Sequence, residues 1–487
     1  MKKKRLEIRK PVLSGPKDWR LGEDEQSPIS NLQSPQNGRL LSVSIPAPGV
    51  ETAVFLQHAL GQPRFFWGEA NGGLTLAGFG IAADLFAWGQ GRFEQIQAQA
   101  QALFAEAVID SGGGAERPLP GPRLFGGFAF IDDFTPDNTW SIHYPAQFIL
   151  PHYQLAQQDG QSWLTLNAIL PPDEAPESLL PELRSALAAR LELFLTQRNK
   201  GEKGSKEKAK AQQIDYPMSY EEWEKMIQQA TQTMQHGPLN KAVLSRVCEI
   251  RYGQKVDVDG ALAYLNATYP DCYRFLFEPR PFHAFYGATP ELIVGVNGRS
   301  LHTMGLAGSI GRGKTPAEDD ALAQELLNST KNQHEHALVV QSIRRRLAPL
   351  TSELTIPDEP GILQLGYIQH LFTPIQATLK QADGVLPILQ TLHPTPALGG
   401  QPRELAIPLI SQAEPVPRGW YGAPVGWLDH HLDGAFGVAI RSAITQDRRV
   451  WLYAGAGIVA DSDPQAEWDE TALKFRPMLN ALGMVNG

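Results

Sequence analysis

The sequence predicts an α+β fold in which antiparallel sheets carry their helices on the outside. Three turn signals, each between two apolar stretches, indicate β-hairpins. They are Asp159-Gly160 between residues 148–155 and 162–170, Asn297-Gly298 between 285–296 and 301–304, and the turn 446–449 between 435–445 and 450–454. Because hairpins outnumber the β–α–β patterns that a parallel sheet needs, antiparallel pairing is expected.

Helical patterns occupy several of the remaining segments. One helix is expected over residues 177–197. A second begins at Ser219, because Ser219 and Glu222 have the spacing of a capping box, and it ends before Gly237. A strand is expected over 241–250, and one long helical region over 317–346.

Two polar segments divide the chain of 487 residues. Residues 1–37 are rich in Pro, Ser, Asp and Glu, which predicts a flexible tail. Residues 198–213, RNKGEKGSKEKAKAQQ, are charged and poor in apolar side chains, which predicts an exposed linker. The folded parts are then expected at 38–197 and 214–487, as separate domains or as one large intertwined domain.

Charge and composition exclude several classes of protein. The net charge of −9 argues against non-specific binding to nucleic acid, and it means that an anionic substrate needs cationic groups nearby. No stretch approaches the ~18 apolar residues of a membrane span, so no membrane contact is expected. The basic start, MKKKRLEIRK, lacks the apolar stretch of a secretory signal. With only two cysteines, Cys248 and Cys272, these features predict a cytoplasmic protein without disulfides.

The segment 453–474, YAGAGIVADSDPQAEWDETALK, carries the clearest sign of chemistry. Glu467, Glu470 and Lys474 are spaced by three and four residues, which places them on one face of a helix. Two carboxylates on one face repel each other, and a hard divalent cation such as Mg²⁺ removes that repulsion. Before the helix, Gly455 and Gly457 let backbone N–H groups approach an anion. A solvated helix face with an ordinary Glu470–Lys474 ion pair has the same spacing.

Other charged residues could act in catalysis or metal binding. Lys241, at the start of a predicted strand, is a candidate general base, and Glu291, at the end of the turn GATPE, is a candidate general acid. Glu335 could bind Mg²⁺, whereas His334 and His336 are two residues apart on a helix and cannot face one metal. Each of these residues could equally be a solvated side chain at the end of an element.

Arg441 lies in an otherwise apolar strand, FGVAIRSAI. A buried arginine without an anionic partner is costly, so a carboxylate ligand is a plausible partner. An edge position with the head group in water is the alternative.

The stretch from Gly308 to Thr315, GSIGRGKT, matches the pattern of a phosphate-binding loop. Its context is wrong, because the preceding SLHTMGLA does not look like a buried parallel strand. Pro316 follows at once and tolerates only the first turn of a helix. Nucleotide binding is therefore a distant alternative.

Taken in order, a series of motifs resembles the chorismate-utilising enzymes, and most closely the isochorismate synthases. The motifs are KAVLSR (241–246), GATPEL (287–292), GLAGSIGR (305–312), KNQHEHALVV (331–340), IQHLFT (368–373), LHPTPALGG (392–400), YGAPVGWLD (421–429), AIRSA (439–443), YAGAGIV (453–459) and AEWDETALK (466–474). They lie within residues 214–487, and the first part of the chain resembles the family only loosely, at PRLFGGFAF and in the hairpins. The resemblance implies two large antiparallel sheets packed face to face with a cleft between them, and an N-terminal part that folds with the rest.

The resemblance also implies a Mg²⁺-dependent isomerisation of chorismate and a role for each matching residue. Lys241 would activate the water that attacks ring carbon 2, and Glu291 would protonate the hydroxyl that leaves carbon 4. Glu335 and Glu470 would bind the metal, with Glu467 close by and acting through water. The remaining contacts to substrate would come from Gly308 and His370 at the ring carboxylate, from Arg441, Gly455, Gly457 and Lys474 at the enolpyruvyl side, and from Tyr421 in the wall of the cleft.

Two neighbouring groups of enzymes differ at these motifs. Anthranilate and aminodeoxychorismate synthases use ammonia and carry a PAGT-like turn where this chain has HPTPAL; resemblance to anthranilate synthase would also predict no lysine at position 241. Salicylate synthases keep both Lys241 and Glu291 and go on to eliminate pyruvate, so salicylate formation stays an alternative. The resemblance further implies a monomer whose product enters quinone, siderophore or salicylate synthesis, with menaquinone or phylloquinone favoured.

Overall fold

A computed structural model of the chain describes residues 38–111, 119–171, 174–197 and 211–484, and they form two large β-sheets. The first sheet has thirteen strands, with β19 (Gly400–Gln401) paired to β11 beside the main path. The main path runs β10 (Ala211–Asp215), β11 (Lys241–Tyr252), β23 (Arg449–Ile458), β22 (Ser442–Gln446), β13 (His283–Thr289), β12 (Tyr273–Arg280), β2 (Arg64–Gly68), β3 (Thr75–Phe79), β8 (Tyr153–Gln158), β9 (Gln161–Leu170), β1 (Arg39–Pro46), β5 (Val108–Asp110).

The second sheet has ten strands, with β17 (Gly361–Gln364) paired to β18 beside the main path. That path runs β16 (Thr351–Thr355), β18 (Ile368–Leu379), β15 (Ser300–Gly311), β14 (Leu292–Asn297), β21 (Gly434–Val438), β20 (Pro424–Asp429), β6 (Arg123–Phe128), β7 (Ala146–Leu150), β4 (Ala83–Ala87). The strand pairs are antiparallel in both sheets except for β1 with β5, which is parallel. Strands from residues 39–170 and from 211–458 occur in both sheets, so neither sheet belongs to one part of the chain.

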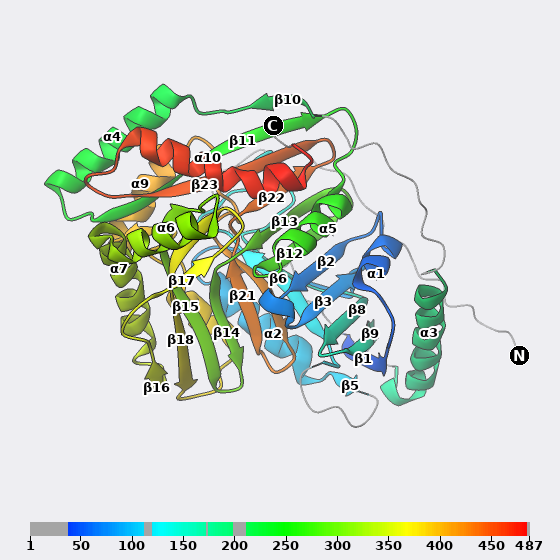
Figure 1. The fold of residues 1–487 in the computed structure, drawn as a ribbon. Coiled ribbons are helices and arrows are strands. Elements are labelled where there is room, and N and C mark those ends of the chain that lie inside the picture. Colours follow the sequence, from blue (N-terminus) through cyan, green and yellow to red (C-terminus); the bar gives the residue numbers. More distant parts are fainter. Residues whose placement is uncertain (1–37, 112–118, 172–173, 198–210, 485–487) are drawn as a thin grey trace, which may run out of the picture.

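The two sheets pack face to face. One cluster of buried side chains joins Phe65, Phe277 and Phe285 of the first sheet to Phe125 and Val425 of the second. Figure 1 shows the helices on the outside of this sandwich. They are α1 (Thr52–His58), α2 (Arg92–Ala105), α3 (Pro176–Gln197), α4 (Tyr220–His236), α5 (Val258–Thr268), α6 (Pro316–Asn328), α7 (Thr330–Leu347), α8 (Val385–Leu392), α9 (Arg403–Ala413), α10 (Pro464–Ala481) and a short 3₁₀ helix at Ala70–Gly72. The predicted α+β class with two antiparallel sheets is confirmed.

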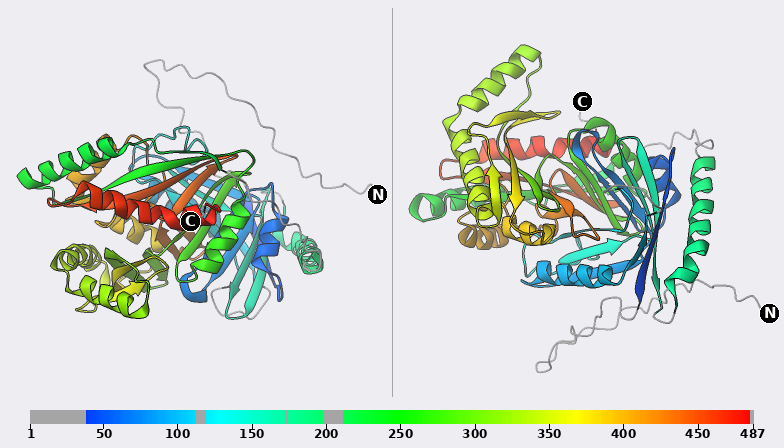
Figure 2. Two further views of the ribbon diagram at one scale, coloured as in Figure 1. Left: turned by 45° about the horizontal axis from the view of Figure 1, so that its top comes forward. Right: turned by 90° about the horizontal axis from the view of Figure 1, so that it is seen from below.

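Helices α10 and α7 cover the parts of the sheets that matter most for the site. Helix α10 packs on β23, and α7 packs on β15. Figure 2 shows α10 lying along the β11–β23 end of the first sheet, while α3 lies at the opposite end beside β1 and β9. Among the described residues, no helix combines the length and the apolar character that a membrane crossing requires.

The three predicted hairpin turns are confirmed. Strands β8 and β9 pair across Asp159-Gly160, β14 and β15 pair across Gly298, and β22 and β23 pair from Gln446 to Arg449. The predicted capping box is also present: the Ser219 side chain accepts the Glu222 backbone N–H, and the Glu222 side chain accepts the Ser219 backbone N–H.

Two predicted strands are wrong as single elements, because each crosses from one sheet to the other. The stretch 285–296 ends in the first sheet as β13 and restarts in the second as β14, with Pro290-Glu291 between them. Proline lacks the N–H that a ladder needs, which breaks the strand there. The stretch 435–445 likewise divides into β21 and β22 at residues 439–441, where Arg441 has a left-handed φ of 50°.

These two crossings lie beside each other. The Val438 N–H donates to the Glu291 carbonyl at 2.9 Å, and the Ala288 N–H donates to the Arg441 carbonyl at 3.2 Å. The pair of crossings therefore fixes the positions of Glu291 and Arg441 relative to one another through the backbone.

Three further expectations need correction or fall outside the described residues. The long helical region 317–346 is two helices, because Ser329 leaves the helical conformation and caps α7 with its side chain. The end of the predicted linker, residues 211–213, lies in β10 and pairs with β11. The predicted tail 1–37 and the linker residues 198–210 lie outside the described residues.

The segment that matches a phosphate-binding loop has a different structure. Residues up to Gly311 belong to β15, an antiparallel strand. The N–H groups that follow are taken by acidic side chains: Gly313 donates to Asp319 Oδ1 at 2.9 Å, and Lys314 donates to Glu318 Oε2 at 2.9 Å. These N–H groups are therefore not presented to a phosphate.

Candidate active site

One cavity of about 250 Å³ is lined by all twelve residues that the resemblance assigned to the site. Those residues are Lys241, Glu291, Gly308, Glu335, His370, Tyr421, Arg441, Gly455, Gly457, Glu467, Glu470 and Lys474. They come from β11, β15, β18, β23, α7, α10 and the two sheet crossings, and Tyr421 comes from the turn before β20. Other lining residues had not been singled out as site residues, among them Ser309, Lys331, Asn332, Ala397 and Leu398.

Lys241 is the first residue of β11, and it is only 2% exposed. Its Nζ atom lies 2.6 Å from Oε1 of Glu335 on α7, so the two form an ion pair. Gly457 of β23 makes room for this pair, because a Cβ atom there would lie 2.9 Å from Lys241 Cε and 3.3 Å from Glu335 Oε1. A side chain at 457 would therefore displace the end of the Lys241 side chain from its position beside Glu335.

Glu291 lies at the crossing between β13 and β14 and is 5% exposed. Burial raises the pKa of its carboxyl to about 8, and the positive charges of Lys241, Arg441 and Lys474 only partly oppose this shift. Glu291 is therefore mainly protonated at neutral pH, and a neutral carboxylic acid can donate a proton.

Arg441 lies at the other crossing, where its backbone has the left-handed φ of 50°. A non-glycine residue in this region is held there by its surroundings and often marks a functional position. Burial lowers the pKa of its guanidinium. Among the described residues the guanidinium has no hydrogen-bond or ion-pair partner, which leaves it able to bind an anion in the cavity.

A β-bulge in β15 brings Gly308 and His370 to the cavity wall. The register between β15 and β18 shifts between Ala307 and Ser309, and Gly308 has a φ of 77° that suits glycine. Burial lowers the pKa of His370 to about 3, and the cations Arg441 and Lys474 contribute to this shift. The imidazole is therefore neutral.

Helix α10 supplies two carboxylates and one ammonium group to the cavity. Lys474 Nζ lies 2.6 Å from Glu470 Oε1 and donates to the Gly455 carbonyl at 2.8 Å. Burial tends to raise the pKa of Glu470, but the charge and hydrogen bond of Lys474 outweigh it, so this pKa is lowered. Burial and the neighbouring Glu470 raise the pKa of Glu467 to about 7, and the Ser462 hydroxyl donates to Glu467 Oε1. Since Glu467 is 5% exposed, the solvated-face interpretation is wrong.

Arg246, which sequence reasoning passed over, fixes α10 against β11. Its Nε donates to Thr471 Oγ1 at 2.7 Å, and its guanidinium lies 3.5 Å from the centre of the Trp468 ring. Thr471 lies between Glu470 and Lys474 along the helix. The contact with Arg246 therefore helps to fix the position of both side chains relative to β11. An arginine inside the apolar motif KAVLSR was the available signal.

Tyr421 forms part of the wall and is 4% exposed. Its ring stacks on Tyr453 with centroids 5.0 Å apart, and its hydroxyl would lie 3.3 Å from a Cβ atom at Gly455. His336 is buried and bonds to Thr373, whereas His334 is exposed, so the two histidines lie on different faces as predicted.

The carboxylates fit Mg²⁺ better than a metal that needs a complete protein cage. Within the described ranges, no group of three or more His, Cys, Asp or Glu side chains is close enough to form such a cage. Mg²⁺ commonly uses one or two carboxylates together with water and substrate oxygens. Glu467 and Glu470 repel each other, which contributes to the raised pKa of Glu467. A divalent cation bound between such carboxylates would remove that repulsion.

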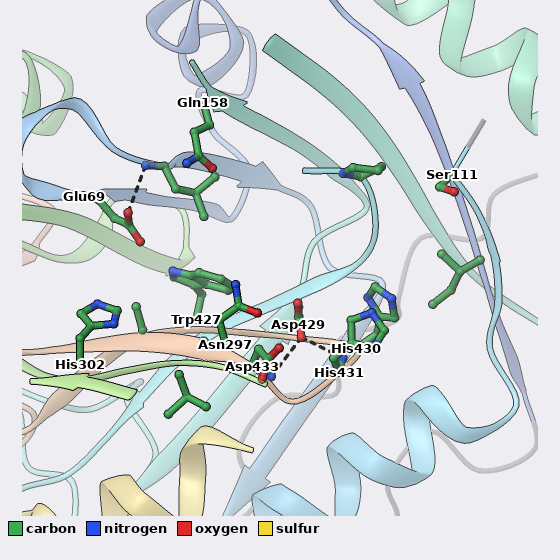
Figure 3. Close-up of a pocket in the computed structure, with 16 residues that line it drawn as sticks. Glu69, Ser111, Gln158, Asn297, His302, Trp427, Asp429, His430, His431 and Asp433 are labelled. Carbon is green, nitrogen blue, oxygen red and sulfur yellow. Dashed lines mark hydrogen bonds between the residues drawn. The ribbon is translucent and has the colours of Figure 1, made fainter. Parts of the chain in front are cut away.

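A larger cavity, of about 440 Å³, lies between the sheets at the β20–β21 turn (Figure 3). Trp427 and Glu69 line it, and the Asp429 carboxylate accepts the N–H groups of His431 and Asp433 at its edge. Of the described residues around this cavity, none is among the twelve predicted site residues that line the smaller one. Size therefore does not identify the candidate active site.

Comparison with known proteins agrees with the geometry. The family described as "Chorismate binding enzyme" matches residues 27–483. The chain is 36% identical over 426 residues to a salicylate biosynthesis isochorismate synthase of Pseudomonas aeruginosa, covering 87% of this chain and 86% of the relative. It is 34% identical over 430 residues to the isochorismate synthase MenF of Bacillus subtilis, covering 86% and 88%.

The fold is also similar to that of a solved isochorismate synthase structure. The menaquinone-specific isochorismate synthase MenF of Escherichia coli is 26% identical, with a TM-score of 0.75 over 93% of this chain and 97% of that one. These matches confirm the resemblance to the isochorismate synthases, and the chain belongs to the chorismate-binding enzyme family.

Proposed function

We propose that the protein converts chorismate to isochorismate by adding water at ring carbon 2 and releasing the hydroxyl from carbon 4. The observation that carries the proposal is the cavity in which a buried glutamic acid with a pKa of about 8, Glu291, occurs together with a buried lysine, Lys241. Glu291 is suited to donate a proton, and Lys241 would accept one in its neutral form, released from its ion pair with Glu335. The similar isochorismate synthases support the assignment.

The cations of the cavity suit the dicarboxylate substrate. Arg441, whose guanidinium has no partner among the described residues, and Lys474 on α10 would hold the enolpyruvyl carboxylate. The backbone of Gly455 and Gly457 lines the same cavity and would approach the enolpyruvyl group. Gly308 and His370 would contact the ring carboxylate from the β15 bulge. These local charges compensate for the net charge of −9.

In the proposed reaction, Lys241 accepts a proton from water while the water oxygen bonds to carbon 2. The ring double bond shifts, the bond from carbon 4 to its hydroxyl breaks, and Glu291 gives its proton to the leaving oxygen. One water enters and one leaves, so no oxidant or reductant is needed. Holding both groups around one bound ring supplies the proximity that this displacement requires.

Mg²⁺ would be held by Glu335 and Glu470, with Glu467 close by and bonded through water. When bound, it would neutralise the ring carboxylate and stabilise negative charge that develops during the reaction.

One assay separates the alternatives. The purified protein is incubated with chorismate and Mg²⁺, with and without ammonia, and the products are resolved by chromatography. Isochorismate alone is the expected product. Salicylate with pyruvate would instead indicate a salicylate synthase, an aminated product would indicate an ammonia-using relative, and no turnover under either condition would refute the proposal.

For the pathway, we propose that the product feeds menaquinone or phylloquinone synthesis. Similarity to two enzymes named MenF supports this, one of them described as menaquinone-specific. The relative from Pseudomonas aeruginosa is named for salicylate biosynthesis. Deleting the gene and measuring both quinone and salicylate decides between them, since loss of quinone alone is the expected result.

A further inference from the structure

Arg418 is buried just outside the active-site cavity, and its guanidinium holds two parts of the cavity wall. Arg418 is 5% exposed and does not itself line the cavity. Its Nη2 atom donates to the Val243 carbonyl at 2.6 Å, and its Nη1 atom donates to the Leu398 carbonyl at 3.0 Å. Val243 belongs to β11 and Leu398 to the loop between α8 and β19, and both line the cavity. One guanidinium therefore joins two wall segments that are far apart in the sequence.

Glu414, which follows α9 directly, orients this guanidinium. Its carboxylate accepts the Arg418 Nε donor at 2.8 Å and also bonds to Arg418 Nη2. Both side chains are buried. A two-point contact between arginine and a carboxylate fixes the plane of the guanidinium. A lysine cannot reproduce this contact, because its ammonium group is a single point of charge on a flexible stem.

The Arg418–Glu414 pair also completes the edge of β11 that faces away from β23. On this edge β19 pairs with the start of β11, and β10 pairs with its end. Between these strands the Val243 carbonyl accepts Arg418, and the Ser245 N–H donates to Glu414 Oε1 at 2.7 Å. The two side chains therefore satisfy backbone groups of β11 that neither β19 nor β10 reaches.

Lys241, the proposed base, lies on the same strand, two residues before Val243. It also pairs with β19, the strand into which the loop held by Arg418 continues. The Arg418 carbonyl accepts the Tyr421 N–H at 2.9 Å, and Tyr421 is a third residue of the cavity wall. Arg418 therefore lies where three segments of the wall meet.

We infer that Arg418, oriented by Glu414, is a positioning residue that fixes Lys241 and the wall beside it relative to the bound ring. The inference rests on the proposed function for the identity of that ring. The carboxylates of the substrate would be bound by other residues, among them Arg441 and Lys474. Loosening the Arg418–Glu414 pair should therefore slow the chemical step and leave substrate affinity nearly unchanged.

Arg418→Lys is the variant that tests this role. It keeps the charge and an ion pair with Glu414, but one ammonium group cannot span the Val243 and Leu398 carbonyls. Arg403→Lys is the matched control. Arg403 Nη1 donates to the His393 carbonyl at 2.8 Å in the same loop, but His393 does not line the cavity. The control should keep wild-type turnover.

Single-turnover kinetics, with enzyme in excess over chorismate and with Mg²⁺ present, separate positioning from folding. The rate constant reports the chemistry of the folded molecules, and the amplitude reports how much of the protein is folded. Arg418→Lys should lower the rate constant about 10²-fold, the cost of displacing a catalytic group by ~1 Å. The amplitude and the steady-state KM should stay near those of wild type.

Two kinetic outcomes overturn the inference. A wild-type rate constant with a reduced amplitude would show that Arg418 supports only folding, and an equal loss of rate in Arg403→Lys would show that the effect is not specific to the cavity wall. If Arg418→Lys does not fold, Glu414→Gln takes its place, because it keeps the size of the side chain and one oxygen acceptor. It should show the same lowered rate constant at unchanged KM.

Amide hydrogen exchange tests the Arg418–Glu414 pair without substrate. Peptides spanning residues 241–247 and 395–401 should exchange faster in Arg418→Lys than in wild type, while peptides from β1 and β9 keep their wild-type rates. Faster exchange throughout the chain, or no change in these two segments, overturns the inference. If the wild-type protein does not turn over chorismate, the proposed function fails, and exchange still decides whether Arg418 holds the wall.

Discussion

The Nζ atom of Lys241 lies 2.6 Å from Oε1 of Glu335, so the proposed base and a proposed Mg²⁺ ligand form an ion pair. Lys241 comes from the first position of β11 and Glu335 from the second turn of α7, elements of different layers. Glu335 therefore belongs to both proposed functions, and any shift of its carboxylate toward a metal changes the surroundings of the lysine. Because of this coupling, the contribution of Lys241 to proton transfer and that of Glu335 to metal binding must be measured with separate variants.

Replacing Lys241 by alanine should abolish water addition. Loss of a general base typically lowers turnover by about 10²- to 10⁴-fold, and here it also leaves Glu335 without its partner. The measurement is isochorismate formation by chromatography, with folding checked by thermal unfolding. Lys225→Ala on the exposed side of α4 is the control and should keep wild-type activity. Wild-type turnover by the Lys241 variant would refute its role.

Activity should fall as pH rises through about 8, because Glu291 must be protonated to act as an acid and burial raises its pKa to about 8. Glu291→Gln removes the proton donor and should lower turnover by about 10²- to 10⁴-fold. Its residual activity should lack the alkaline decline. The profile of kcat/KM against pH for both proteins is the measurement, and an identical decline in the variant would assign that decline to another group.

The same carboxyl affects stability with a definite sign. Its pKa rises on folding from the ordinary 4.5 of a glutamate to about 8, so the folded chain binds more protons than the unfolded chain between these values. The contribution to the free energy of unfolding is therefore full below the unfolded pKa and is lost as pH approaches 8. The free energy of unfolding in urea is measured for wild type and Glu291→Gln near pH 4.5 and near pH 8. It should change less with pH in the variant than in wild type.

Parts of the fold and of the site were predictable because their signals are local. Turn residues at Asp159-Gly160 and the capping box at Ser219 act over a few residues, and the structure has both. The placement of Glu467 and Lys474 on one face follows from helix geometry. Their burial does not follow from helix geometry. It depends on the packing of α10 against β23, which the spacing of residues along the helix does not reveal.

The crossings between the sheets were not predictable from strand patterns. An apolar stretch such as 285–296 looks the same whether it stays in one sheet or changes sheet at Pro290. What decides the outcome is pairing with distant strands, β22 for its first half and β21 for its second. The Lys241–Glu335 pair is hidden for the same reason, because 94 residues separate its members.

Mg²⁺ should bind more tightly as pH rises through about 7. Burial and Glu470 raise the pKa of Glu467 to about 7, and a carboxylate must lose its proton before it can assist a metal. Calorimetric titration of chelator-treated protein across this pH range measures the effect. Glu467→Gln should weaken binding by about 10- to 100-fold and flatten the pH dependence. Glu470→Gln should weaken binding further, and equal affinities for the two variants would contradict the assignment of Glu470 as the direct ligand.

Lys314→Ala should leave chorismate turnover within about twofold of wild type, since surface substitutions usually have small effects. Lys314 is exposed, and its backbone N–H donates to Glu318 and not to a phosphate. Calorimetry with ATP should show no binding to either protein. Binding that is present in wild type and lost in the variant would restore the nucleotide-binding alternative.

Gly457→Ala should disable the enzyme without unfolding it. The added Cβ atom would lie 2.9 Å from Lys241 Cε and 3.2 Å from Lys241 Nζ, so the lysine must move. A displacement on the order of 1 Å in a catalytic group can cost about 10²-fold in rate. Gly311→Ala is the matched control, because a Cβ atom at that β15 position meets nothing within 4 Å. Turnover near wild type for Gly457→Ala would mean that the position of Lys241 is not critical, and an equal loss in both variants would point to strand destabilisation instead.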